Sequence, residues 1–536
     1  PVATTDRSLS DLSATADGHI ILHAGQGITV YDADDDNAGV SAAGSGNILL
    51  WAETSGDIDF EADARIFSSS GNITVRANEN IWQKDRAHII SYGGTIDVEA
   101  ETGGITMNDG VYATTDGDVD NNIRYKAATD ILLGSLSADN ADVSINAGGN
   151  IVDNGDEYAE VIANELRLIA GGNIGEPVGT NNGHLDLTVD ELAAQSSGAS
   201  GTFVTNSQAL EIAEVDTVIA HRVNTSGGVD NEADGANLSN VVTQTNAGDI
   251  VIVTTAGDLT VTDGGDGDGM GVSADQDGNI LLETLAGSIT ANADVLSGTG
   301  HITIKADDNI DLTAGVDVST ATSGTISLVA ETGTLSMAGT SNVTSTDSSA
   351  RLRADGDITV GNVTATDVSI DSDSGSIVNA AGSSKNVTAT NLRLQAEGSI
   401  GASDRHLTTD IDVVTADAAT GSMYLTEDDG VTVSSVRTEV TEFKSDATTA
   451  LVTDPAQSDL STGDNGNIVL VATLGDITLN DGDAGVNQAG GDGRSADGTA
   501  VSAHGSGNIL IDALSGNATA NADVLSGTGH ITIKAD

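Results

Sequence analysis

Three stretches of the chain concentrate aspartate in glycine-rich loops, and carboxylates in such loops are the residue types that bind divalent cations. The stretches read YDADDDNAG (Tyr31–Gly39), TDGGDGDGMG (Thr262–Gly271) and NDGDAGVNQAGGDGRSADG (Asn480–Gly498). Calcium takes several carboxylate and carbonyl oxygens from a flexible loop. We therefore predict two candidate calcium sites, with aspartates at alternate or nearly alternate positions: Asp32, Asp34 and Asp36 in the first, and Asp263, Asp266 and Asp268 in the second.

The alternative is that these stretches are solvated loops that hold no ion. They differ in length and in aspartate spacing, as tolerated surface loops do. The run Gly264–Val272 also approaches a calcium-binding nonapeptide pattern, but Gly269 stands where that pattern has aspartate. The sequence predicts no cofactor apart from this candidate calcium.

Catalytic residues do not stand out. Polysaccharide-cleaving enzymes need clustered carboxylates or a basic group beside them. The 9 histidines are scattered, and two pairs of them, His184/His406 and His301/His530, are copies within a repeat. We therefore expect no enzymatic activity, with a polysaccharide-active β-helix enzyme as the remaining alternative.

Aromatic residues are rare, at 2% of the chain, and five of them gather near its beginning. If exposed, they would offer a contact for carbohydrate or for another subunit. If buried, they would cap or fill an insertion. The five residues are Trp51, Phe60, Phe67, Trp82 and Tyr92.

The charge of the chain is strongly negative. It has 81 acidic and 19 basic residues, a formal net charge of −62. Such a surface repels nucleic acid and anionic lipid, so we expect no nucleic-acid partner. The chain has no cysteine and no apolar run long enough for a membrane span. It begins Pro1–Val2, and we expect both ends to be cuts in a longer protein.

A long repeat organises the chain. The words GVSAAGSGNILL (Gly39–Leu50), GVSADQDGNILL (Gly271–Leu282) and AVSAHGSGNILI (Ala500–Ile511) align without gaps, which gives a unit of about 230 residues. The chain thus divides into a partial super-repeat at 1–38, a first copy at 39–270, a second copy at 271–499 and the start of a third at 500–536.

A short repeat lies inside the long one and predicts the fold. Its marker is glycine, a polar residue, then isoleucine or leucine followed by alternation, as in GNITV at Gly71 and GTIDV at Gly94. Short alternating runs bounded by Gly, Asn and Asp are typical of strands. Equivalent strands recur about every 22–25 residues, the period of a stacked solenoid coil. We predict an all-β, right-handed parallel β-helix in the form of an elongated rod, and we disfavour a string of β-sandwiches because aromatic residues are so few.

The strand words resemble a known family. The glycine-marked coils, LRLQAEGSIG (Leu392–Gly401) and TADAATGSMYLTEDDGVTV (Thr415–Val433) are similar to filamentous-haemagglutinin-like bacterial surface proteins with β-strand repeats. The resemblance implies a right-handed parallel β-helix, export, and a role as a stalk or adhesive fibre. The sequence shows no secretion domain or receptor-binding module of that family, which leaves the export route open.

These features together predict a structural segment of a long extracellular fibre, stalk or filament at the bacterial cell surface. Its partners would be itself or adjacent segments of the same long chain, and no transmembrane segment is expected here. The main alternative is an adhesin that binds a host surface or a glycan through outward loops.

Overall fold

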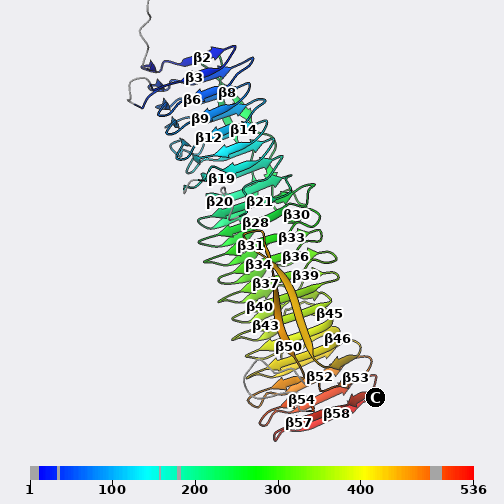
Figure 1. Cartoon of the computed structure of the whole chain (residues 1–536). Coiled ribbons are helices and arrows are strands. Elements are labelled where there is room, and N and C mark those ends of the chain that lie inside the picture. Colours follow the sequence, from blue (N-terminus) through cyan, green and yellow to red (C-terminus); the bar gives the residue numbers. More distant parts are fainter. Residues whose placement is uncertain (1–10, 33–36, 156–157, 178–182, 483–497) are drawn as a thin grey trace, which may run out of the picture. The chain divides into compact units, whose positions relative to one another are not determined.

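The computed structural model describes residues 11–32, 37–155, 158–177, 183–482 and 498–536, and these contain strands but no helix. The chain forms two compact units, and Figure 1 labels strands from both. Unit 1 comprises Pro1–Ala256, Asp263–Gly271 and Ser445–Ala447, and unit 2 comprises Gly257–Thr262, Val272–Lys444 and Thr448–Asp536. The predicted super-repeat boundaries stay a prediction.

Unit 1 is built from coils of three short strands, each stacked on the equivalent strand of the next coil. The first face holds β4 (Val40–Ala42), β7 (Ile66–Ser68), β10 (Ile89–Ser91), β13 (Tyr112–Thr114) and β16 (Ser135–Ser137). The second holds β2 (Ile20–Ala24), β5 (Ile48–Ala52), β8 (Ile73–Ala77), β11 (Ile96–Ala100), β14 (Ile123–Ala127) and β17 (Val143–Ala147). The third is a six-stranded sheet of β3 (Ile28–Val30), β6 (Ile58–Phe60), β9 (Ile81–Gln83), β12 (Ile105–Met107), β15 (Ile131–Leu133) and β18 (Ile151–Asp153).

The pairing between coils is parallel and in register. Ile96 pairs with Ile73 on one side and with Ile123 on the other. Thr95 bonds to Asn72, which lies 23 residues earlier, so the coil length agrees with the predicted period. The all-β parallel β-helix predicted from the sequence is confirmed.

Unit 2 repeats this arrangement. Its first face holds β33 (Asp294–Ser297), β36 (Asp317–Thr320), β39 (Asn342–Ser345) and β42 (Asn362–Thr364). Its second holds β31 (Ile280–Thr284), β34 (Ile302–Ala306), β37 (Ile326–Ala330), β40 (Ser349–Ala354) and β43 (Asp367–Ser372). Its third holds β32 (Ile289–Ala291), β35 (Ile310–Leu312), β38 (Leu335–Met337), β41 (Ile358–Val360) and β44 (Ile377–Asn379).

The core of each unit is a set of aliphatic columns, because alternate strand residues point inward and coils stack in register. Ile302 and Ile304 are fully buried, as the alternation predicts. Tyr125 also lies in the interior, where its hydroxyl bonds to Gln83 Oε1 at 3.1 Å. Burial raises the pKa of Tyr125.

Some strands run without a break around a corner of the coil. They are β19 (Val161–Ala170) and β20 (Leu185–Ser196) in unit 1, and β45 (Val387–Ala396) and β46 (Leu407–Ala418) in unit 2. The segment Glu157–Ala170 has the nearest approach to helical spacing in the sequence. Its described residues from Val161 onward form strand β19.

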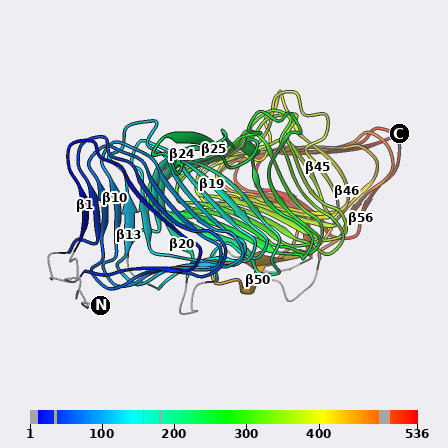
Figure 2. The same ribbon diagram turned by 90° about the horizontal axis from the view of Figure 1, so that it is seen from above.

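Each unit also carries an antiparallel hairpin that leaves the coil and packs on its outside. In unit 1, β24 (Ile219–Val223) pairs with β25 (Val229–Ala233) and contacts β8, β11 and β14. In unit 2, β49 (Val436–Phe443) pairs with β50 (Thr449–Gln457), and β49 contacts β34, β37, β40 and β43. Figure 2 shows β24 and β25 outside the coils, and β50 crosses the coils of unit 2 in Figure 1.

The hairpins explain a difference from the sequence-based expectation. Alternation predicts that Thr303 points to the outside of its strand, toward solvent, yet Thr303 is only 3% exposed. Its hydroxyl accepts a hydrogen bond of 2.9 Å from the Phe443 backbone N–H of the hairpin. The outward face of these coils is therefore a second, polar packing surface.

Buried ion pairs hold the hairpin of unit 1. Asp97 on β11 is fully buried and accepts from both Arg124 and Arg222, each at 2.7 Å. Arg222 also pairs with Glu99, and Arg124 and Arg222 both approach Glu232 of β25. The charge cluster thus combines Asp97, Glu99 and Arg124 from the coils with one arginine and one glutamate from the hairpin.

We predict that Asp97→Ala lowers the free energy of unfolding by about 3 kcal/mol, because it leaves the buried guanidinium of Arg124 and the partly buried one of Arg222 without their shared carboxylate. Chemical denaturation, with hydrogen exchange of the β24 amides, would measure the loss. The control is Asp373→Ala, which removes an exposed partner of Arg353 and should cost about 1 kcal/mol or less. Equal losses for both variants would contradict the role given to the buried cluster.

Candidate functional site

The second acidic loop brings its predicted ligands together. It follows β29 (Leu259–Val261) in the sequence, and oxygens of Asp263, Asp266 and Asp268 lie within 4.8 Å of one another. The Gly269 N–H donates to Asp263 Oδ1 at 2.7 Å and the Met270 N–H to Asp268 Oδ1 at 2.8 Å. This curl depends on glycine, since Gly267 and Gly269 have φ near +80° (77° and 81°).

Electrostatics at this loop favour a cation. Partial burial and the neighbouring carboxylates of Asp268 and Asp263 raise the pKa of Asp266, because crowded negative charges disfavour ionisation. A bound divalent ion would relieve this repulsion. The candidate calcium site at Asp263, Asp266 and Asp268 stays a prediction whose geometry is compatible with shared coordination.

The first acidic loop is described only in part. Asp32 accepts from the Asn37 backbone N–H at 3.0 Å, whereas Asp34 and Asp36 lie outside the described residues. Most of the third loop, 483–497, also lies outside them.

A second acidic cluster was missed by the sequence reasoning. Oxygens of Asp410, Glu427 and Asp429 lie within 4.8 Å of one another in unit 2. Glu427 is fully buried at the end of β47 (Met423–Glu427), where burial raises its pKa. It accepts from the Thr409 hydroxyl and, at 3.0 Å, from the Ile411 N–H. The Glu427 carboxyl group therefore binds backbone and hydroxyl groups at a corner of the coil, and it is not accessible to a substrate.

Comparison of the two super-repeats explains this cluster. In unit 1 the corresponding strand, β21 (Gly201–Asn206), ends in Asn206, whose amide donates to the carbonyls of Val189, Gln208 and Ala209 at 3.0, 3.0 and 3.2 Å. Glu427 takes the same corner position without the amide donor. Aligning GTFVTN with SMYLTE places Glu427 opposite Asn206, and this alignment could have predicted the buried glutamate from the sequence.

A buried carboxyl pair lies at another corner of unit 1. Glu160 is 1% exposed and accepts from the Asp186 N–H at 2.5 Å, and the side chain of Asp153 is a further buried carboxylate. Burial, together with the charges of Asp153 and Asp186, raises the pKa of Glu160 to about 9. Its counterpart in unit 2 is Asn386, which is neutral and donates to the Val360 carbonyl at 2.7 Å.

The five aromatic residues noted in the sequence divide between core and surface. Phe60 is in the core. Trp51 stacks on His23, with ring centroids 4.3 Å apart, and lies beneath Arg76. Phe67 meets Tyr92 edge to face, and Tyr92 is 54% exposed. Trp82 is half-buried on β9. They do not form one cluster.

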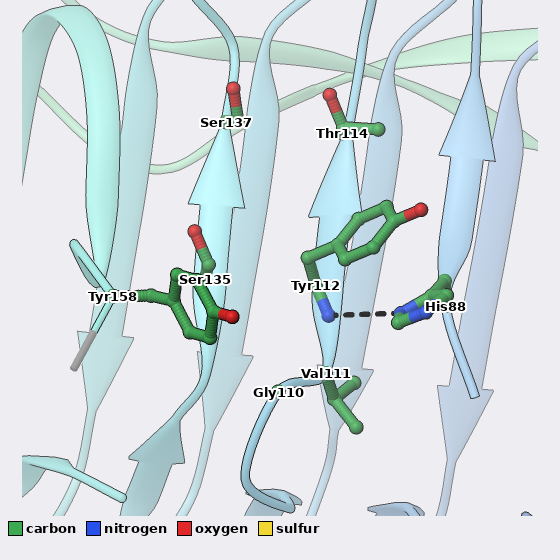
Figure 3. Close-up of a pocket in the computed structure, with 8 residues that line it drawn as sticks. All are labelled: His88, Gly110, Val111, Tyr112, Thr114, Ser135, Ser137 and Tyr158. Atoms are coloured by element: carbon green, nitrogen blue, oxygen red, sulfur yellow. Dashed lines mark hydrogen bonds between the residues drawn. The ribbon is translucent and has the colours of Figure 1, made fainter. Parts of the chain in front are cut away.

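A groove that the sequence reasoning missed lies on the first face of unit 1. It has a volume of about 390 Å³ and is shown in Figure 3. It is lined by two tyrosines, a histidine and small hydroxyl side chains, with a glycine and a valine: His88, Gly110, Val111, Tyr112, Thr114, Ser135, Ser137 and Tyr158. Aligning the two super-repeats would have shown that aromatic residues occur here in only one of them.

We predict that Glu160→Gln stabilises the chain at neutral and alkaline pH. Between about pH 5 and pH 9 the folded chain holds a proton that the unfolded chain has released, so its free energy of unfolding falls as pH rises. Glutamine needs no proton, and at pH 8 we expect a gain of more than about 1 kcal/mol. Denaturation at several pH values measures it, with the exposed-site variant Glu397→Gln as control. Parallel pH profiles for wild type and Glu160→Gln would contradict the prediction.

We predict that calcium raises the melting temperature of the chain through the second acidic loop, with a Kd of about 10⁻⁴–10⁻³ M, because the three carboxylates are mostly exposed. The double variant Asp266→Asn/Asp268→Asn should lose the shift, whereas Asp311→Asn on an exposed position of β35 should keep it. Calorimetry at physiological salt that shows no calcium heat, with no change in melting, would contradict the site.

Neither a family model nor a curated protein nor a solved structure matches the chain. The resemblance to filamentous-haemagglutinin-like surface proteins is therefore supported only at the level of architecture, an all-strand parallel β-solenoid. Among the described residues, no helix is both long and apolar enough to cross a bilayer.

Proposed function

We propose that this chain is a structural segment of a long extracellular fibre or stalk at a bacterial cell surface. The observation that carries the proposal is the in-register parallel ladder, in which a strand such as β11 pairs with β8 before it and β14 after it. In such a solenoid each coil contacts mainly its neighbours, so added copies add length without a new core. A spacer needs this property and needs no catalytic site.

The charge of the chain supports an extended, exposed role. A net charge of −62 keeps neighbouring chains apart in solution and disfavours nucleic acid as a partner. The absence of cysteine leaves the fold independent of the redox state of its surroundings. The partners that fit are adjacent segments of the same chain, or another copy that pairs with an exposed strand edge.

Two buried carboxylates with raised pKa values favour a structural over an enzymatic role. Glu160 and Glu427 have raised pKa values, a property of many catalytic acids, but both side chains are buried among backbone hydrogen-bonding groups. A general acid must reach the atom that it protonates. We therefore assign these two residues to the corners of the coils.

The length of the particle tests the proposal. A unit of about 230 residues should add about ten coils, or ~50 Å, at the ~4.8 Å spacing of paired strands. We expect electron micrographs of chains with one, two and three units to show contour lengths that grow by this increment. A contour length that does not grow with unit number would overturn the spacer role. Protease treatment of intact source cells tests location, and a protected chain would overturn surface exposure.

A further inference from the structure

The groove on the first face of unit 1 has one rigid aromatic wall. The Tyr112 ring stacks on the His88 ring, with centroids 3.7 Å apart and an interplanar angle of 18°. His88 is 7% exposed, and its Nδ1 accepts from the Tyr112 backbone N–H at 3.3 Å (Figure 3). His88 therefore fixes one face of Tyr112 and leaves the other side of the ring toward the groove.

The wall is uncharged. Burial, with the nearby charges of Arg65 and Arg86, lowers the pKa of His88 to about 4. Its Nδ1 acts as an acceptor, which agrees with a neutral imidazole. At neutral pH the stacked pair thus presents an apolar ring face and a phenol hydroxyl without an ionic group.

The opposite wall and the floor come from the next two coils. Ser135 pairs with Tyr112 across the ladder, and its hydroxyl donates to the Ala159 carbonyl at 2.8 Å. That bond anchors the residue next to Tyr158, which is 65% exposed. In Figure 3, Tyr112 projects from strand β13, whereas Tyr158 projects from the loop that precedes β19. Two coils span about 10 Å, enough for one saturated ring between two aromatic side chains at van der Waals distance.

The second super-repeat shows that the fold does not need these aromatic residues. Asn342 begins β39 where Tyr112 begins β13, and Asn362 begins β42 where Ser135 begins β16. Asn342 donates to Asp317, the counterpart of His88, at 2.5 Å, which makes an ordinary polar ladder. Ser384 stands three residues before β45, as Tyr158 stands before β19.

We propose that this groove binds a pyranose residue of a neutral polysaccharide. A sugar ring offers an apolar C–H face to an aromatic ring, which the tyrosines supply. Its hydroxyls can donate to the oxygens of Ser135 and Ser137, whose own O–H groups already donate to Ala159 and Asp139. Its volume of about 390 Å³ falls within the range of ligand pockets. The net charge of −62 disfavours an acidic polysaccharide. This binding goes beyond the spacer role, which needs no ligand.

The test uses the whole chain with cellohexaose, laminarihexaose, mannohexaose and chitohexaose, and with hexagalacturonate as an anionic comparison. Calorimetry measures affinity, and saturation-transfer NMR reports whether sugar C–H protons contact tyrosine rings. We expect at least one neutral oligosaccharide to bind with a millimolar or lower Kd and hexagalacturonate to bind more weakly.

Three variants locate the binding. Tyr112→Asn and Tyr158→Ser copy the second super-repeat, and each should weaken binding at least about tenfold. Tyr92→Ser removes an exposed tyrosine outside the groove and should leave affinity unchanged. Far-ultraviolet circular dichroism and melting confirm that each variant is folded. The proposal is overturned if no neutral oligosaccharide binds at millimolar concentration, if the anionic one binds better, or if both groove variants bind as wild type does.

Discussion

The hydrogen-bond ladder between successive coils is the constraint on which the rest of the structure depends. A short strand such as β11 cannot bury its backbone groups alone, and it is satisfied only between β8 and β14. Because the pairing is parallel and in register, each residue stands about 4.8 Å above its equivalent in the coil below. Each side chain must therefore be compatible with the equivalent side chains directly above and below it in its column.

This constraint gives the polar corners their form. Asn47, Asn72 and Thr95 occupy one column, and the side-chain oxygen of each asparagine accepts from the backbone N–H one coil later, at 2.8 and 2.9 Å. Like charges in a column would repel at that spacing, so neutral amides and hydroxyls suit the corners. Where a carboxyl group replaces an amide, as at Glu160, its raised pKa reflects the unfavourable free energy of placing a negative charge at a buried corner.

The same ladder tolerates insertions, provided that the chain leaves a coil and returns to it in register. Asn467 bonds to Ser422 across the ladder at 3.0 Å although 45 residues separate them, because the hairpin of unit 2 lies between. Insertions can therefore carry specific contacts without disturbing the stack. In both units such an insertion covers outward side chains of earlier coils with charged groups, as Arg222 does at Asp97 and Asp454 at Arg351.

The two super-repeats provide an internal comparison of what the fold requires. Tyr112 and Asn342 occupy equivalent positions on equivalent strands, so the backbone accepts either. The aliphatic columns are kept in both units, whereas the first-face column changes from stacked rings to an amide ladder. Side chains in such an outward column can change without loss of the coil, so a binding surface can develop there.

The sequence by itself determined the coils. Alternation and glycine spacing are local signals, and they predicted the strands, the parallel stacking, the coil length and the grouping of Asp263, Asp266 and Asp268. Only the tertiary structure decided which coils the hairpins cover and which side chains form the groove. Arg222 and Asp97 lie 125 residues apart, and Tyr112 and Tyr158 belong to different coils. A repeat pattern specifies contacts between neighbouring coils, but contacts made by an insertion, or across corners of variable length, depend on where the folded chain returns.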